Sequence, residues 1–141
     1  MSDYVRSTMK LTDAAVLQML DAAVSKAKEL GQPQCIIIVD ASGEVLGEFR
    51  MDGAKYLSRK SARAKARTAA SIGAPSAAIP ETVRPLIALA TEGDVTGLGG
   101  GLPIRIDGVL LGGIGVGSGT PDQDLAVASA ALSAIGVKRA G

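Results

Sequence analysis

Glycine is concentrated in one part of this chain, and that concentration limits the fold more than any other feature of the sequence. Eleven of the 27 residues from Gly93 to Gly119 are glycine. Because glycine has no side chain, other parts of the chain can approach its backbone closely. The segment 57–72 carries alanines at helical spacing, so it offers a second surface of small residues. We therefore expect strands and helices that lie in direct contact.

The apolar pattern predicts an α+β fold in the order helix, two strands, two helices, three strands, helix. Thr12 and Ser58 are the predicted N-caps of the first two helices, and Thr120 or Asp122 starts the last one. Short hairpin connections, such as Asp107-Gly108, favour an antiparallel sheet. The predicted helices are at 13–30, 57–72, 81–91 and 120–135, and the predicted strands are at 34–41, 44–51, 95–98, 102–106 and 109–116.

The length of 141 residues is that of one domain. We expect a frayed N-terminus at 1–8 and a single domain at 9–141. Lys and Arg total 15 against 14 Asp and Glu, and the net charge of +1 argues against nucleic acid as a partner. No apolar run reaches the ~18 residues of a membrane span, and the first residues do not resemble a signal peptide. The expected location is therefore the cytoplasm, with no membrane partner.

The chain has no His and one Cys, which excludes several kinds of site. A Ser-His-Asp or Cys-His catalytic centre requires His, and so does a His-ligated metal or haem. A single Cys excludes an internal disulfide and a thiolate zinc cluster. Cys35 begins an apolar strand, so we interpret it as an inert core residue. No metal site is predicted.

Basic residues on the segment 57–72 and the glycines of 99–101 suggest an anion site. Arg59 and Arg63 are spaced by four on an outer face, whereas Lys65 and Arg67 lie closer to the alanine face. One of these two is therefore expected to point inward, towards a pocket. Gly99, Gly100 and Gly101 leave backbone N–H groups open to an anionic ligand. The alternatives are a solvated helix face and glycines that serve only close packing.

Asp124 lies in the first turn of the last predicted helix and is a candidate partner for Lys65. A Lys–Asp pair beside a glycine-lined cavity can perform acid/base chemistry. A structural ion pair explains the same residues, and the sequence leaves both interpretations open.

Several of these motifs occur in the order seen in the GlcG/HbpS family, and the chain resembles that family over about residues 9–137. The same module is similar to the C-terminal domain of PduO-type proteins. Residues 73–95 match less well. The matching segments are Arg50–Ala54, Lys65–Ala70, Gly100–Ile104, Asp107-Gly108, Gly112–Val116 and Gln123-Asp124.

The resemblance implies a profilin-like α+β domain with a five-stranded antiparallel sheet, a homo-oligomer, and haem or another tetrapyrrole as an anionic ligand. Without His, an axial ligand to haem would have to be Tyr56, Met51 or another oxygen or sulfur donor. The usual Gly-Val-Ser-Gly of the family is Gly115-Val-Gly-Ser118 here, with the Ser displaced by one residue. The ligand-binding residues implied are Asp52, Lys65, Arg67, Gly99, Gly100, Gly101 and Pro103.

Three functional interpretations remain at this point. The first is a binding module for an anionic small molecule. The second is a cofactor-independent lyase or isomerase acting on a small organic acid, with Lys65 and Asp124 as acid and base and N–H groups near Gly100 and Gly101 holding an oxyanion. The third is a structural or assembly subunit with faces of small residues.

Overall fold

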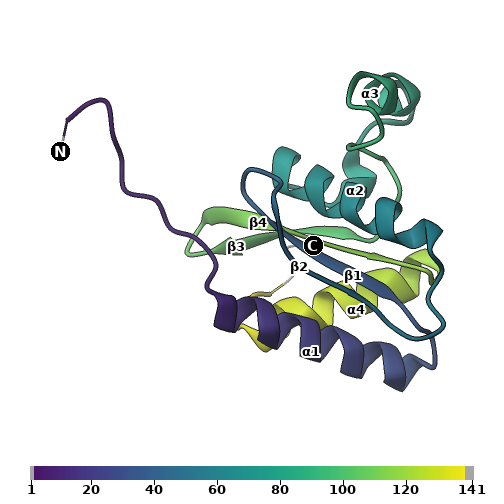
Figure 1. The fold of residues 1–141 in the computed structure, drawn as a ribbon. Helices are drawn as coiled ribbons and strands as arrows, with labels where there is room; N and C mark the ends of the chain where they lie inside the picture. The colour runs from purple at the N-terminus through teal and green to yellow at the C-terminus, as the bar shows by residue number, and fades with distance from the viewer. Residues whose placement is uncertain (1, 139–141) are drawn as a thin grey trace.

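The computed structural model describes residues 2–138, so residue 1 of the predicted frayed segment and residues 139–141 of the predicted domain lie outside it. A single antiparallel sheet lies between α2 on one face and α1 with α4 on the other (Figure 1). The sheet order is β2-β1-β4-β3. The elements are α1 (Asp13–Leu30), β1 (Cys35–Asp40), β2 (Val45–Arg50), α2 (Leu57–Ile72), η1 (Ser76–Ala78), η2 (Glu81–Val83), α3 (Arg84–Ala90), β3 (Gly101–Ile106), β4 (Val109–Gly117) and α4 (Pro121–Ala134).

The α+β class is confirmed, but the sheet among residues 2–138 has four strands and not the predicted five. The segment 95–98 forms no strand, so the predicted order of three consecutive strands is wrong. Threonine hydroxyls accept hydrogen bonds from two backbone N–H groups of this segment. Val95 N donates to Thr91 Oγ1, and Thr96 N donates to Thr68 Oγ1. An N–H group bonded to a hydroxyl is lost to a strand ladder.

The ends of the helices follow the capping rules in two cases and break them in a third. Thr12 Oγ1 accepts from the N3 backbone of α1, and Thr120 forms a capping box at α4. Ser58, the predicted cap of α2, instead lies inside the helix, where its hydroxyl accepts a hydrogen bond from Ser118. The predicted helix 81–91 divides into a 3₁₀ turn and the short α3, with Pro85 in the first turn.

Side chains of β1 alternate between two cores, as expected for a strand covered on both faces. Ile36 and Ile38 face α1 and α4 in the larger core. Cys35, Ile37 and Val39 face α2, where the other side of the contact consists of small alanines. The alanines of α2 in this second core are Ala62, Ala66 and Ala70.

Helix α2 lies directly on the backbone of β4, and two glycines make this contact geometrically possible. A Cβ atom added to Gly115 would overlap Ala62 O and lie 2.6 Å from Ala66 N. At Gly113 the added atom would overlap Ala66 O. The expectation from the glycine and alanine segments is therefore confirmed, since any side chain on this face of β4 would separate the two elements.

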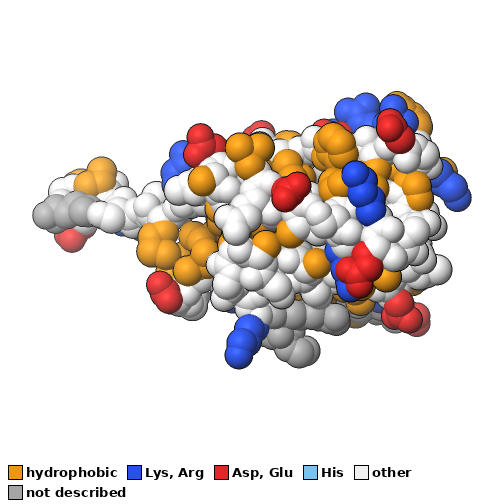
Figure 2. All heavy atoms as spheres, turned by 90° about the horizontal axis from the view of Figure 1, so that it is seen from below, with side chains coloured by type: hydrophobic (Ala, Val, Ile, Leu, Met, Phe, Trp, Pro, Cys, Tyr) orange, Lys and Arg blue, Asp and Glu red, His pale blue; other side chains and the backbone are white. Residues whose placement is uncertain are grey.

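The face formed by α1 and α4 carries acidic and basic side chains that are scattered singly among apolar and neutral ones (Figure 2). Neither sign of charge gathers there, in keeping with the net charge of +1. Among the described residues, no helix combines the length and apolarity that a membrane crossing would require.

Candidate functional site

Lys65 and Asp124 meet in the interior, at the end of the sheet where β4 leads into α4. Lys65 Nζ lies 3.2 Å from Asp124 Oδ2 and also donates to Val116 O at 2.8 Å. The two side chains are 7% and 4% exposed. Of the two basic residues expected to point inward, Lys65 is therefore the one that does.

Glycines enclose this ion pair from two sides. A Cβ atom at Gly100 would lie 3.1 Å from both Lys65 Nζ and Asp124 Cβ, and Gly100 has a φ of +120° that side chains rarely adopt. The backbone N–H of Gly119 donates to Asp124 Oδ1 at 3.0 Å. The predicted proximity of Lys65, Asp124 and the glycine segment is thus observed, and it leaves neither charged group open to solvent.

The glycine segment is less free to hold an anion than the sequence suggested. Gly101 N donates to Ser76 Oγ at 2.9 Å, and Gly100 O accepts from Val116 N. Ser76 Oγ in turn donates to Leu98 O. A ligand at this position would have to replace one of these contacts, so anion binding at residues 99–101 stays a prediction.

Burial raises the pKa of Asp124 above its ordinary value, because the charged carboxylate loses its hydration in the interior. The ammonium of Lys65 and the Gly119 N–H act in the opposite direction with smaller effect. The charged form of Asp124 therefore depends on Lys65 and the Gly119 N–H, which offset part of the hydration lost on burial.

Gln34 joins this buried cluster and is not among the predicted site residues. Its side chain is fully buried, and neither its Oε1 nor its Nε2 makes a hydrogen bond within residues 2–138. A Cβ atom at Gly119 would lie within 2.9 Å of both Gln34 Nε2 and Asp124 Oδ1, so both groups face the same glycine. The sequence feature that could have indicated it is the position of Gln34, a polar residue directly before the apolar run of β1.

Two predicted site residues lie elsewhere. Arg67 points to the opposite end of the sheet, where Nε donates to Gly43 O and Nη1 donates to Asp94. Its guanidinium ties the β1–β2 turn to the loop after α3, so it does not join Lys65. Pro103 lies in β3, paired with Gly113 at the edge of the sheet. Arg59 lies on the outer face, as expected, in an exposed ion pair with Glu48.

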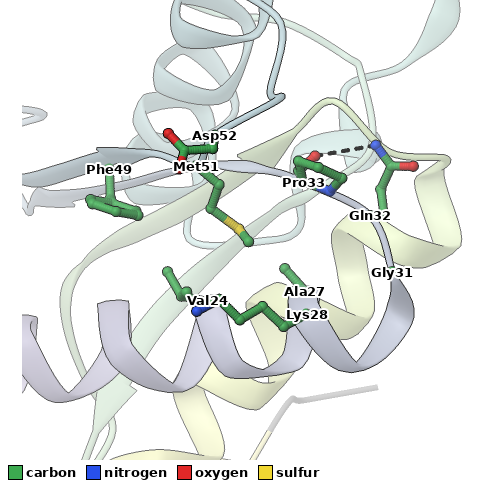
Figure 3. Close-up of a pocket in the computed structure, with 9 residues that line it drawn as sticks. All are labelled: Val24, Ala27, Lys28, Gly31, Gln32, Pro33, Phe49, Met51 and Asp52. Carbon is green, nitrogen blue, oxygen red and sulfur yellow. Dashed lines mark hydrogen bonds between the residues drawn. The ribbon is translucent and has the colours of Figure 1, made fainter.

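A cavity of about 470 Å³ opens between the end of α1 and the end of β2 (Figure 3). Met51 extends from the sheet towards α1, and two apolar walls lie beside it, Phe49 on the sheet and Val24 on α1. Asp52, a predicted site residue, is exposed at its rim. The full lining consists of Val24, Ala27, Lys28, Gly31, Gln32, Pro33, Phe49, Met51 and Asp52.

Met51 and Asp52 of this cavity are predicted from the sequence, whereas Val24, Lys28 and Phe49 are not. Val24 and Lys28 are spaced by four in the last turns of α1 and so share one face of the helix. Phe49 is one of three aromatic residues in the chain. What no sequence pattern indicated was that α1 and the end of β2 would lie side by side.

The sulfur and oxygen donors considered for a haem iron differ in accessibility. The Cys35 thiol is 1% exposed beneath α2, and burial raises its pKa, which favours the protonated thiol. Tyr56 is 69% exposed and does not line the cavity. Met51 is 9% exposed and does line it. Of these three donors, the thioether of Met51 is the one that lines the cavity.

Comparison with known proteins agrees with this architecture. The protein corrinoid adenosyltransferase PduO of Citrobacter freundii is 36% identical over 135 residues, which are 92% of this chain and 40% of that protein. This chain therefore corresponds to less than half of that relative. A Klebsiella pneumoniae structure, protein ORFY, has a TM-score of 0.88 at 29% identity, covering 95% of this chain and 96% of that one.

A crystal structure described as a PduOC:Heme complex has a TM-score of 0.86 at 31% identity and covers 94% of this chain and 100% of that one. The family model described as haem degrading protein HbpS-like matches residues 11–133. The match covers α1 through nearly all of α4, which includes the buried pair and the cavity. The chain belongs to the HbpS-like family.

Proposed function

We propose that this chain is a small-molecule-binding domain whose ligand is largely apolar and carries an anionic group, with haem as the ligand that its relatives suggest. The observation that carries the proposal is the cavity of about 470 Å³ between α1 and β2. Its volume lies within the usual range of ligand pockets, roughly 300–1,000 Å³. The PduOC:Heme relative supports haem as the specific ligand.

The residues of the cavity fit such a ligand. Phe49 and Val24 supply apolar walls, and Met51 supplies a thioether that can bind a haem iron. Lys28 at the rim can bind a carboxylate. Haem bound there would supply a redox-active iron. We expect this binding to be weaker than that of His-ligated relatives, because no imidazole is present in the chain.

Titration with haemin, followed by the Soret absorbance, tests the proposal. We expect the wild-type chain to give a saturable Soret band. Met51→Leu keeps the side-chain volume and removes the sulfur donor, so the band should shift and the affinity should fall about tenfold, the equivalent of ~1.4 kcal/mol. Met19→Leu is the matched control, since Met19 is fully buried in α1 and does not line the cavity.

The outcomes separate the function from the location of the site. A wild-type chain that gives no saturable band contradicts haem as the ligand. A normal band with identical titrations of wild type and Met51→Leu contradicts this cavity as the site. The enzyme interpretation is less well supported, because Lys65 and Asp124 are buried and already bonded to each other and to the backbone.

A further inference from the structure

The two edges of the sheet differ in how well they are protected against another strand. β3 forms one edge, and the backbone nitrogen of its Pro103 points outward. This follows from the ladder, because Gly100 pairs with Val116 through a hydrogen bond, and bonded and non-bonded pairs then alternate to Pro103 and Gly113. A proline at that position removes the N–H group that an added strand would need.

β2 forms the other edge and has no proline between Val45 and Arg50. Met51 N donates to Gln34 O, so the same alternation assigns bonded pairs to Phe49 with Ile36 and non-bonded pairs to Glu48 with Ile37 and Arg50 with Cys35. The backbone N–H and C=O groups of Glu48 and Arg50 therefore point away from the sheet. An unprotected edge of this kind is a template for pairing with another strand.

The charges on this edge determine which pairing is favourable. Glu48 and Arg50 lie two residues apart and so project from the same face of β2. Two copies of β2 that pair antiparallel with Phe49 on the two-fold axis bring Glu48 opposite the partner subunit's Arg50, and Arg50 opposite the partner subunit's Glu48. Registers centred on Glu48 or on Arg50 would instead oppose like charges.

The favourable register also gives hydrogen-bond partners to the outward backbone groups of β2. Glu48 and Arg50 have outward N–H and C=O groups, and in this register the two residues form the hydrogen-bonded pairs across the new junction. Glu48 already accepts from Arg59 Nε at 2.8 Å, and a carboxylate has free lone pairs for a second guanidinium. Phe49, which is 47% exposed on the other face of β2, would meet the partner subunit's Phe49.

We propose that a second copy of this chain binds at the β2 edge, antiparallel and with Phe49 on the two-fold axis, so that two four-stranded sheets become one. This pairing is isologous, because each copy uses the same residues. The same surface is used by both partners, and Glu48 and Arg50 select the register.

Charge reversal tests this interface by sedimentation velocity at micromolar concentration. The wild-type chain should have a mass of two chains or a larger even multiple. In Arg50→Glu two Glu–Glu pairs form across the axis, and in Glu48→Arg two Arg–Arg pairs form. Each variant alone should therefore have a lower mass than the wild type, and the mass of one chain if the wild type is a dimer. An equimolar mixture of the two variants opposes Glu to Arg at both positions and should recover the wild-type mass.

Lys60→Glu is the matched control, because it makes the same charge change on an exposed part of α2 and should keep the wild-type mass. Thermal unfolding of each variant within a few degrees of wild type verifies the fold. A wild-type mass of one chain overturns the proposal, as does a wild-type mass for Arg50→Glu. A mixture that remains at the mass of the separate variants overturns the register.

Discussion

The buried pair of Lys65 and Asp124 connects α2, the end of β4 and the start of α4 through a small number of atoms. One ammonium bonds to a carboxylate and to Val116 O, and that carboxylate also accepts from Gly119 N. Removal of one partner from such a pair leaves an uncompensated charge in the interior, which is more harmful than loss of the pair as a whole.

Lys65→Met should therefore lower the free energy of unfolding by about 3 kcal/mol, the lower end of the effect of breaking a buried pair. Urea denaturation measures this change. Lys26→Met is the control, since Lys26 forms a more exposed pair with Glu29 and its loss should change stability by less than about 1 kcal/mol. A Lys65→Met chain with wild-type stability and tenfold weaker haemin binding would instead make Lys65 a ligand-binding residue.

Asp124 should also make stability depend on pH. Its folded pKa is raised above 3.8 by burial, so the folded state binds the proton more tightly than the unfolded state does. The contribution of Asp124 to stability is therefore lost as pH rises from about 3.8 through the folded pKa. The double variant Lys65→Met/Asp124→Asn removes both charges and serves as the reference.

We expect the free energy of unfolding of the wild type, relative to this double variant, to decrease from acid towards neutral pH. Urea denaturation at a series of pH values measures the difference. A difference that increases with pH would mean that Lys65 lowers the pKa of Asp124 more than burial raises it.

At the level of elements, the contact of α2 with β4 determines which positions of the interior can accept a larger side chain. Gly113 and Gly115 bring the strand against the helix backbone, so this interface contains no side chain on the strand side that could adjust. Close-packed interiors transmit such a steric conflict to both elements.

Gly115→Ala should lower the free energy of unfolding by about 1–3 kcal/mol or prevent folding, because the new methyl group overlaps Ala62 O. Gly99→Ala is the control, since the nearest atom to an added Cβ there is 3.9 Å away. Thermal or urea unfolding distinguishes the two. Equal stability of the two variants would show that α2 is free to move away from the sheet.

The sequence predicts most elements because their signals are local. Thr12 and Thr120 occupy capping positions, and the continuous apolar run of β1 and the turn at Asp107-Gly108 are readable from neighbouring residues. The strand at 95–98 was wrong because Thr68, far away in the chain, takes the N–H of Thr96. Such a competing partner is visible only once the fold brings it close.

The site was predicted only in part, because some of its contacts have local signals and others arise only in the folded chain. The spacing of α2 placed Lys65 near its alanine face, and Asp124 was a plausible partner, so their contact could be anticipated. Arg67 is only two residues further on, but it reaches the other end of the sheet. The cavity between α1 and β2 arises from tertiary packing, and only Met51 and Asp52 of its lining had been singled out.

For the whole molecule, the two proposals predict that haemin binding and self-association are linked. Phe49 lines the cavity and would also lie on the two-fold axis, so the partner subunit's Phe49 would adjoin the rim. Any effect of pairing on affinity must then be matched by a corresponding effect of haemin on pairing. We expect haemin to lower the concentration at which the chain dimerises, measured by sedimentation in its presence and absence.

Arg50→Glu provides the reciprocal measurement, because it should bind haemin more weakly than wild type. Each dimer has two sites, so the square of this per-site factor should equal the change that haemin makes in the dimerisation constant. Lys60→Glu should bind like wild type. Dimerisation that is unaffected by haemin would mean that the cavity is complete within one chain.

The outward nitrogen of Pro103 has a consequence for the size that an assembly built from these sheets can reach. A sheet with two receptive edges can add subunits without end and grow into a filament. Here β3 cannot pair fully with a further strand, because Pro103 lacks the N–H group. Pairing at β2 therefore uses the one edge of each copy that can accept a strand. Growth through backbone pairing therefore stops at eight strands, and anything larger must be held together by other surfaces of the molecule.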